Sequence, residues 1–348
     1  MIEGTQSLPV GLIGCGTMGG SHAKQMGALA DLRLAAACDV DEAKARATAE
    51  AAAQTGGAAP RVFTSVEALL AQDDIPAVLV ATPNFTHRGI VLQALAAGKD
   101  VFCEKPMALT VADCDAMIEA AGRAGRKLMV GQVLRLITVF AAVRRLVAEG
   151  VIGQPRAIRI LRCSVRRGGG RGGQGGDGPW RAAWRSKREN TGGLLFEINV
   201  HEFDFMRAVM GEAAEVSAMA ENFTRPDYDY EDHAVVTVRF RDGGLGLLES
   251  SAATAIGATE GLITGEGGSI HYDWGKNTVR YRQVGSEVVD VPVERDAGRS
   301  VQSELSSFAR WVLHDEPPLV TAEDGRRAVQ LAEAAYCSVR EKRTVAIE

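Results

Sequence analysis

The stretch that decides the fold is LPVGLIGCGTMGGSHAKQM, residues 8–26. It joins a short apolar run to a helical pattern through Gly14, Gly16 and Gly19. In such a Gly-x-Gly-x-x-Gly turn the first glycine permits the tight bend, the second lets a pyrophosphate approach the backbone, and the third lets the helix pack on the strand. The start of the helix adds free N–H groups that favour phosphate. The stretch therefore predicts a dinucleotide-binding α/β domain, the alternative being a glycine turn that binds nothing.

A carboxylate further along the chain supports this interpretation. Asp39 ends the next apolar run, about 20 residues beyond Gly19. A side chain at this place would accept hydrogen bonds from the adenosine ribose hydroxyls and would repel a 2′-phosphate. We therefore expect NAD in preference to NADP, with Thr17 and Met18 of the turn also among the cofactor-binding residues.

Six apolar runs in the first part of the chain are predicted to be strands. They cover residues 8–14, 32–39, 61–63, 77–83, 100–106 and 127–132. Their continuous apolarity is typical of parallel strands that are buried on both faces. Helical patterns separate them, and several of these patterns begin at Ser, Thr or Asp, as capping predicts. We expect a doubly wound parallel sheet of the Rossmann type over residues 1–132.

The pattern changes after about residue 135. A helix at 138–149 and a strand at 155–165 precede a second helical stretch at 193–211. Residues 213–293 are nearly all strands that turn at DG, GG or GS, which suits an antiparallel meander, and two amphipathic helices end the chain. We predict an α+β domain over 133–348, built on a large, mostly antiparallel open sheet. One face of this open sheet must be shielded from water by other protein surface, so we expect a homodimer or a homotetramer.

The composition is that of an ordinary globular protein. The chain has 348 residues, 46% hydrophobic and 24% charged, with a formal net charge of -5, so its overall field indicates neither a nucleic acid nor a membrane as a partner. No apolar run is long enough to span a bilayer, and the N-terminus lacks the basic region of a signal peptide. The six cysteines form no CxxC pair. We expect reduced thiols in a cytoplasmic protein and no metal site.

A lysine follows the fifth apolar run, in the sequence Glu104-Lys105-Pro106. Residues just beyond the carboxyl ends of parallel strands face the ligand crevice, and the proline restricts Lys105 to an extended conformation. Beside an oxidised nicotinamide, which is a cation, a lysine should have a lowered pKa and could share a proton with a substrate hydroxyl. The alternative is a surface lysine that ends a strand.

A carboxylate and a histidine lie four residues apart in the later helical stretch. If that stretch is one helix, Glu197 and His201 share a face, and Asp204 lies on the same side. A carboxylate beside a histidine orients the imidazole and raises its basicity, which suits a general base. Zinc ligands also occur at this spacing, but no third ligand is clustered nearby. A buried histidine that only stabilises the fold is the other alternative.

Three motifs together resemble the Gfo/Idh/MocA oxidoreductase family, over essentially the whole chain. They are GLIGCGTMGGSH (11–22), ATPNFTHRGIVLQALAAGKDVFCEKPMALT (81–110) and GGLLFEINVHEFDFMRAVMG (192–211). The resemblance implies a sugar or cyclitol enzyme in which Lys105 and His201 are the catalytic pair. It also implies a nicotinamide pocket shaped in part by Pro83, Asn84, His87, Glu104 and Gln132. We expect Thr82 and Lys105 to be cofactor-binding residues as well.

One position departs from the family's pattern. Most relatives carry Asp four residues before the histidine, whereas this chain has Glu197, which is one methylene longer. We keep Glu197 as a catalytic candidate, although its contact with a sugar hydroxyl or with Lys105 does not follow from the resemblance. Asn199 in the same motif is a candidate substrate contact, and so is Arg135.

A basic, glycine-rich loop precedes the third motif. From Arg156 to Arg188, ten Lys or Arg residues stand against one acidic residue, Asp177. Short RGG-like elements can bind RNA, but inside a folded acidic chain we interpret residues 166–178 as a flap near the active site. The cluster could select an anionic substrate or be a solvated basic face. Trp180 and Trp184 could offer a face to a sugar ring or pack in a core.

The sequence thus predicts an NAD-dependent enzyme that transfers hydride between nicotinamide and a secondary hydroxyl of a sugar, glycoside or cyclitol. Polyols suit such a site because each further hydroxyl can bond to a polar side chain. The first alternative is an enzyme that keeps NAD bound and cleaves a glycoside through transient oxidation. The second is a sensor that binds NAD without turnover.

Overall fold

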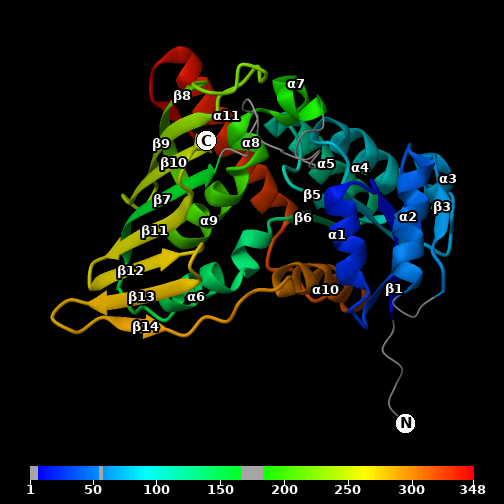
Figure 1. Ribbon diagram of the computed structural model, residues 1–348, viewed down its shortest axis with the longest axis horizontal. Coiled ribbons are helices and arrows are strands. Elements are labelled where there is room, and N and C mark those ends of the chain that lie inside the picture. Colours follow the sequence, from blue (N-terminus) through cyan, green and yellow to red (C-terminus); the bar gives the residue numbers. More distant parts are fainter. Residues whose placement is uncertain (1–6, 55–57, 166–182) are drawn as a thin grey trace, which may run out of the picture. The chain divides into compact units, whose positions relative to one another are not determined.

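The structure is a computed structural model that describes residues 7–54, 58–165 and 183–348 (Figure 1). The chain forms two compact units. Unit 1 comprises Met1–Val133 and Gly298–Arg326, and unit 2 comprises Leu134–Ala297 and Arg327–Glu348. Unit 1 therefore includes a late segment of the chain that a division at residue 132 assigns to the second domain.

Unit 1 contains the predicted parallel sheet. Its six strands lie in the order β3-β2-β1-β4-β5-β6, and all neighbours are parallel. The strands are β1 (Leu8–Ile13), β2 (Leu32–Cys38), β3 (Arg61–Phe63), β4 (Ala77–Val80), β5 (Asp100–Glu104) and β6 (Leu128–Gly131). The helices are α1 (Thr17–Met26), α2 (Glu42–Ala53), α3 (Val66–Leu70), α4 (His87–Ala96), α5 (Val111–Ala124) and α10 (Arg299–His314). The strand order reverses between β1 and β4, which is where ligands bind in open α/β sheets.

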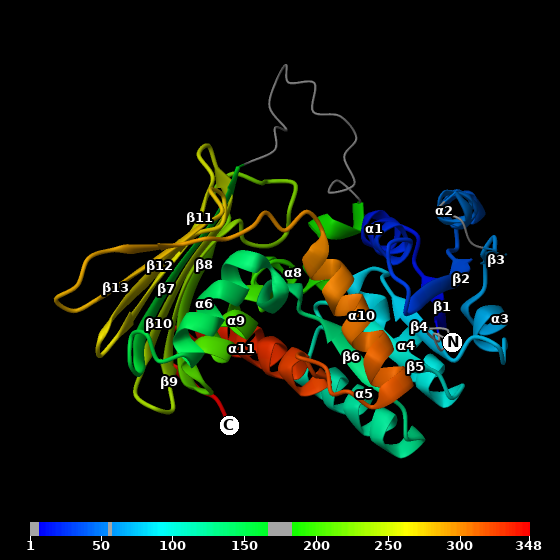
Figure 2. The ribbon, with the colours of Figure 1, turned by 90° about the horizontal axis from the view of Figure 1, so that it is seen from below.

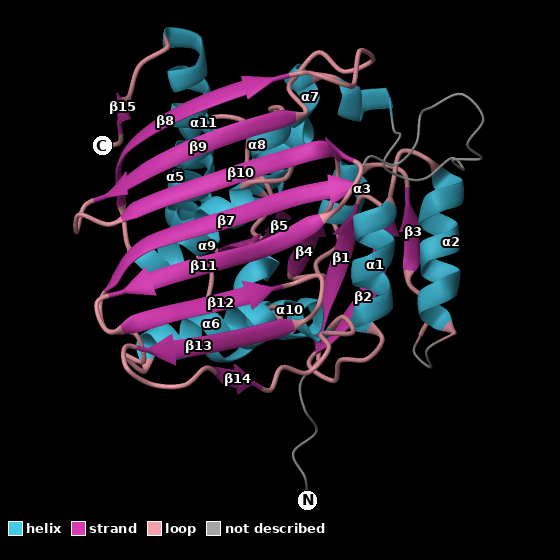
Figure 3. Cartoon of the chain, turned by 60° about the vertical axis from the view of Figure 1, so that its left-hand side comes forward, coloured by secondary structure: helices cyan, strands magenta, loops and turns pink. Residues whose placement is uncertain are grey.

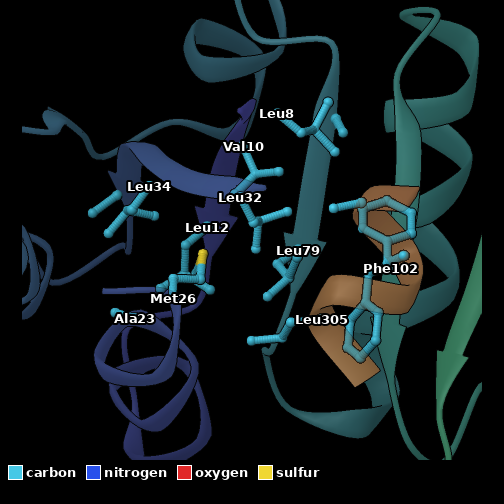
Figure 4. Close-up of a cluster of buried hydrophobic side chains, with 14 of the residues drawn as sticks. Leu8, Val10, Leu12, Ala23, Met26, Leu32, Leu34, Leu79, Phe102 and Leu305 are labelled. Carbon is cyan, nitrogen blue, oxygen red and sulfur yellow. The ribbon is translucent and has the colours of Figure 1, made fainter. Parts of the chain in front are cut away.

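The core of unit 1 explains why α10 belongs to it. Leu12 of β1, Leu79 of β4 and Phe102 of β5 are fully buried (Figure 4). Leu305 and Phe308 of α10 join the same cluster, and the rings of Phe102 and Phe308 meet edge to face at 5.9 Å. The apolar stripe of α10 is thus buried against the parallel sheet, and the hydrophobic effect holds this late helix in unit 1.

Unit 2 is built on a nine-stranded sheet (Figure 3). Its order is β14-β13-β12-β11-β7-β10-β9-β8-β15. The strands are β7 (Pro155–Val165), β8 (Ala213–Glu221), β9 (His233–Phe240), β10 (Leu245–Thr254), β11 (Ala258–Gly265), β12 (Gly268–Asp273), β13 (Thr278–Gln283), β14 (Val289–Val291) and β15 (Val345–Ala346). Strands β7 and β10 pair in parallel and the other neighbours are antiparallel, which confirms the predicted mostly antiparallel sheet.

Helices cover one face of this sheet, including α6 (Thr138–Ala148) and α9 (Val200–Met210) (Figure 2). An aromatic cluster joins them to the sheet: the ring of Phe140 on α6 lies 4.9 Å from that of Phe205 on α9 and 5.1 Å from that of Tyr272 on β12. α11 (Ala322–Glu341) continues from unit 1 into unit 2. Along β9 buried and more exposed residues alternate, so one face of the strand meets the core.

The opposite face of the sheet carries no helix of the described part of unit 2 (Figures 2 and 3). A shallow hollow on it is lined by apolar and polar side chains that include Arg159, Thr237 and Leu247. Leu245 and Leu262 line the same hollow and are 52% and 41% exposed.

All six cysteines are free thiols, and five of them are buried. Burial raises the pKa of Cys15 and of Cys38 to about 11, so these thiols stay protonated and unreactive. Among the described residues, no helix combines the length and the apolarity that crossing a bilayer requires.

Candidate active site

The turn after β1 has the geometry that each of its glycines was predicted to allow. Gly14 has a φ of +94°, and a Cβ there would lie 2.6 Å from the carbonyl oxygen of Ala81. A Cβ on Gly19 would lie 1.9 Å from the carbonyl oxygen of Gly14, so only glycine lets α1 begin this close to the strand. At Gly16 a Cβ would meet nothing within 4 Å. The backbone at Gly16 is therefore open to a ligand.

The start of α1 adds to this open backbone. Its N-cap residue is Gly16, which has no side chain to satisfy the first N–H groups, and Gly16 and Thr17 are exposed. Asp39, just beyond β2, accepts a hydrogen bond from the N–H of Cys15 at 2.8 Å and another from the N–H of Asp41 at 2.9 Å. The carboxylate is thus held beside the turn. Free donors for a pyrophosphate and an acceptor for a ribose fit a dinucleotide.

Asp39→Ser should weaken the selection of NAD over NADP. Losing a hydrogen bond to a carboxylate costs about 1.5–3 kcal/mol, which corresponds to about 10–100-fold in the ratio of kcat/KM for NAD to that for NADP. Steady-state kinetics with the two cofactors measures this ratio. Asp41→Ser is the matched control, because Asp41 is the neighbouring carboxylate and serine can still cap α2. An unchanged ratio in Asp39→Ser would exclude the assigned role.

At the end of β5, the carboxylate of Glu104 is held from two sides. Its Oε1 lies 2.6 Å from Nε2 of His22 on α1, and its Oε2 accepts the N–H of Lys105 at 3.0 Å. Burial acts to raise the pKa of Glu104, but the hydrogen bond with His22, the charge of Lys105 and the backbone N–H of Lys105 outweigh it, so the pKa lies below its ordinary value. A buried anion therefore stands directly beside Lys105, whose own side chain is partly exposed.

A second histidine joins the segments that follow β4 and β5. The ring of His87 is fully buried, with Nδ1 2.8 Å from the carbonyl oxygen of Pro106 and Nε2 2.9 Å from that of Thr82. Burial lowers the pKa of His87, although the two carbonyl oxygens act in the opposite direction. A neutral imidazole carries one N–H, so His87 donates a hydrogen bond to one of these two carbonyl oxygens and packs against the other. Asn84, in the short 3₁₀ helix that follows β4, and Gln132, directly after β6, are also buried.

In unit 2 the predicted single helix over 193–211 is wrong. The structure has a short α8 (Leu194–Glu197) and then α9, separated by Ile198 and Asn199. Ile198 has φ −115° and Asn199 has ψ −2°; each angle departs from the regular α-helical value, although both residues stay in the right-handed region. A β-branched residue followed by asparagine has low helix propensity, and the amide of Asn199 bonds to Glu202 at 3.1 Å. Glu197 and His201 therefore do not share a helical face.

Glu197 has another partner. Its Oε1 pairs with Nη1 of Arg185, which lies in the turn Ala183–Ser186. The guanidinium of Arg185 also lies over the ring of Trp184, 4.5 Å from its centroid. The backbone carbonyl oxygen of Arg185 accepts a hydrogen bond from the hydroxyl of Tyr230 at 2.7 Å. Trp184 therefore has a cation against one face. Trp180 and the basic loop 166–178 lie outside the described residues.

The first turn of α9 carries His201, which is partly exposed. Asn199, in contrast, has no exposed surface and donates to Glu202, so its placement is internal and not that of the expected substrate contact. Arg135 is likewise engaged internally: its Nε and Nη2 donate to the two carboxylate oxygens of Asp204 at 2.7 and 2.6 Å. Both side chains of that ion pair are buried, which fits a structural pair better than a substrate contact.

The structure places most of the predicted cofactor residues at one edge of the parallel sheet, after β1, β2, β4, β5 and β6. The sequence pattern does not show that His22 and Arg185 are partners of site residues. His22 belongs to the glycine motif at residues 11–22, but a local pattern cannot show that it meets Glu104, 82 residues further along the chain. Among the described residues, no cluster of His, Cys, Asp or Glu has the arrangement of a metal site.

The fold and the glycine turn define an NAD-binding oxidoreductase, and comparison with known proteins agrees. Residues 8–132 match the model of an oxidoreductase family with an NAD-binding Rossmann fold, and residues 140–271 match the GFO/IDH/MocA C-terminal domain. The chain is 31% identical to myo-inositol 2-dehydrogenase of Thermotoga maritima, over 97% of this chain and 98% of the relative. The chain belongs to the Gfo/Idh/MocA oxidoreductase family.

Two further similarities show the range of the family. The chain is 34% identical to 2,7-anhydro-N-acetylneuraminate hydratase of Escherichia coli, over 61% of this chain and 55% of that relative. The crystal structure of GenD2 from gentamicin A biosynthesis in complex with NAD superposes with a TM-score of 0.84 at 25% identity, over 99% of this chain and 98% of the other. The expectations of an enzyme and of NAD as its cofactor are confirmed.

Proposed function

We propose that the chain is an NAD-dependent dehydrogenase that oxidises a secondary hydroxyl of a sugar, glycoside or cyclitol. The observation that carries the proposal is Lys105 at the carboxyl edge of the parallel sheet, with its backbone fixed by the buried carboxylate of Glu104. Gly16 and the uncapped start of α1 are open at the same edge and would hold the pyrophosphate. When bound, NAD supplies the hydride acceptor.

The acid–base pair of the proposal is Lys105 and His201. We infer that His201 takes the proton of the substrate hydroxyl while Lys105 holds the oxygen and relays charge. His201 is suited to this role because it is partly exposed in the first turn of α9. Glu197 is already paired with Arg185, which favours a role in holding the turn Ala183–Ser186 over proton transfer.

The substrate class follows from the relatives and from the polar character of these groups. The similar proteins include a myo-inositol dehydrogenase and a 2,7-anhydro-N-acetylneuraminate hydratase, and both named compounds carry several hydroxyls. A polyol can bond to several side chains at once, which fixes the carbon that reacts.

The experiment that tests the function is reduction of NAD by the purified protein with a panel of inositols, aldoses, anhydrosugars, glycosides and sugar acids. NADH that accumulates with one group supports the dehydrogenase and identifies its substrate class. The hydratase relative favours one alternative, in which NAD stays bound and a glycoside or anhydrosugar is converted through transient oxidation. That alternative predicts no net NADH, tightly bound NAD in the denatured protein, and conversion of the sugar.

The open face of the nine-stranded sheet supports self-association. Exposed Leu245 and Leu262 lie within the hollow of that face, and a second copy of the chain would cover them. We propose a homodimer or homotetramer in the cytoplasm, where free thiols such as the buried Cys103 and Cys163 stay reduced. Size-exclusion chromatography with light scattering tests the assembly, and a monomer at micromolar concentration would contradict it.

A further inference from the structure

We propose that His22 is a positioning residue for Lys105 and that it acts through Glu104. The inference rests on the proposed role of Lys105 and adds a residue that the acid–base pair does not include. His22 lies on α1, one turn after the glycine motif, whereas Glu104 and Lys105 lie at the end of β5. The pair therefore joins the helix that begins at the cofactor turn to the strand that carries the lysine.

The contacts make Glu104 a rigid link. Each of its carboxylate oxygens has its own donor: His22 Nε2 lies 2.6 Å from Oε1, and the N–H of Lys105 lies 3.0 Å from Oε2. Both side chains are almost fully buried, with 1% and 9% of their surface exposed. The carboxylate cannot rotate without losing one of the two bonds, so the backbone of Lys105 keeps its place as long as His22 holds the other oxygen.

The ring of His22 is itself fixed. It meets the ring of Phe102, two residues before Glu104 on β5, edge to face at 5.8 Å. Its Nδ1 is buried and has no hydrogen-bond partner in the described part of the chain. A hydrogen on Nδ1 would therefore be unsatisfied, so the ring hydrogen belongs on Nε2, where it donates to Glu104. The contribution of His22 therefore depends on a single hydrogen-bond donor, the Nε2–H group that meets Glu104.

Because one donor carries the contact, replacing His22 by Gln or by Asn, whose amides lie at different distances from the backbone, tests its role. In His22→Gln the terminal amide reaches the place of Nε2 and can donate to Glu104. In His22→Asn the shorter side chain places its amide near Nδ1, on the side without a partner. We expect His22→Gln to keep kcat within about threefold and His22→Asn to lose about 10²-fold, the effect of a displacement of about 1 Å at a reacting group. The KM for NAD should change little in either variant, because the glycine turn is untouched.

A second readout uses the cofactor-free protein. In ¹⁵N-labelled histidine spectra, His22 should give the signal of the Nε2–H tautomer, identified by its absence in His22→Asn. Glu104→Gln should move that signal, since it changes the acceptor. This readout does not depend on turnover, so it tests the contact between His22 and Glu104 separately from the role of Lys105. If Glu104→Gln shifts the His22 signal but Lys105→Ala is fully active, the proposed function is refuted and the contact between His22 and Glu104 still stands.

The matched control is Met26→Ala, one turn further along α1. Met26 is buried in the core of unit 1, so its removal lowers stability without touching Glu104. It should keep kcat. The proposal is overturned if His22→Asn turns over as fast as His22→Gln, if Met26→Ala loses as much kcat as His22→Asn, or if Glu104→Gln leaves the His22 signal unchanged.

Discussion

Lys105→Ala should lower kcat by about 10²–10⁴-fold, the contribution typical of a positioned acid–base group. The lysine follows the last residue of β5, and its backbone N–H is fixed by Glu104, so truncation removes the ammonium group without disturbing the strand. Binding of NAD should be almost unchanged because the pyrophosphate site lies at the turn after β1. Initial-rate kinetics measures kcat, and a titration that follows NADH fluorescence measures the affinity for the cofactor.

The control for this loss is Lys24→Ala. Lys24 is an exposed lysine on α1 of the same unit, so its removal changes the net charge equally and should leave kcat as it is. A Lys105→Ala enzyme that turned over within threefold of the wild type would remove Lys105 from the mechanism. Loss of NADH binding in parallel with kcat would instead assign Lys105 to the cofactor.

Gly19→Ala should prevent unit 1 from folding, whereas Gly16→Ala should fold and bind NAD poorly. The added methyl at Gly19 would lie 1.9 Å from a backbone oxygen that cannot move without breaking the turn. The cost should exceed the ~3 kcal/mol of ordinary overpacking. At Gly16 the methyl meets no protein atom within 4 Å, but it stands where the pyrophosphate approaches. We expect at least about a tenfold weaker Kd for NAD, or about 1.4 kcal/mol.

Thermal unfolding and NAD titration of the two variants check this contrast. Gly20→Ala is the control, because a methyl there also meets nothing within 4 Å and Gly20 lies inside α1, beyond the turn. Equal melting temperatures for Gly19→Ala and Gly20→Ala would contradict the predicted clash. A Gly16→Ala protein with the affinity of the wild type would place the pyrophosphate elsewhere.

Local pattern was enough to predict the strands and the glycine turn. Each strand of unit 1 is a short apolar run between helical patterns, and the steric contacts that require glycine at Gly14 and Gly19 involve the backbone of the turn and of the neighbouring strand. The amphipathic pattern of α10 also predicted a helix with one buried face. It could not show against which sheet that face packs, because amphipathicity defines a face and not its partner.

Partners distant in sequence account for the other differences. The run from Leu194 to Met210 is continuously helical in its apolar pattern, so the break at Ile198 and Asn199 was not expected. The ion pairs of Glu197 with Arg185 and of Arg135 with Asp204 depend on the tertiary fold. The sequence made Glu197 and Arg135 candidates for chemistry, and only the geometry showed which residues neutralise their charges.

The return of α10 to the first sheet has a consequence for biosynthesis. All six strands of that sheet have been synthesised once residue 131 is made, yet Leu305 and Phe308, which complete its core, are synthesised only near the end of the chain. At translation rates of about 5–20 residues per second the nascent sheet would wait for many seconds with an apolar surface uncovered. A truncated product that stops after residue 133 should accordingly be prone to aggregation and a target for chaperones, although it contains the entire NAD fingerprint.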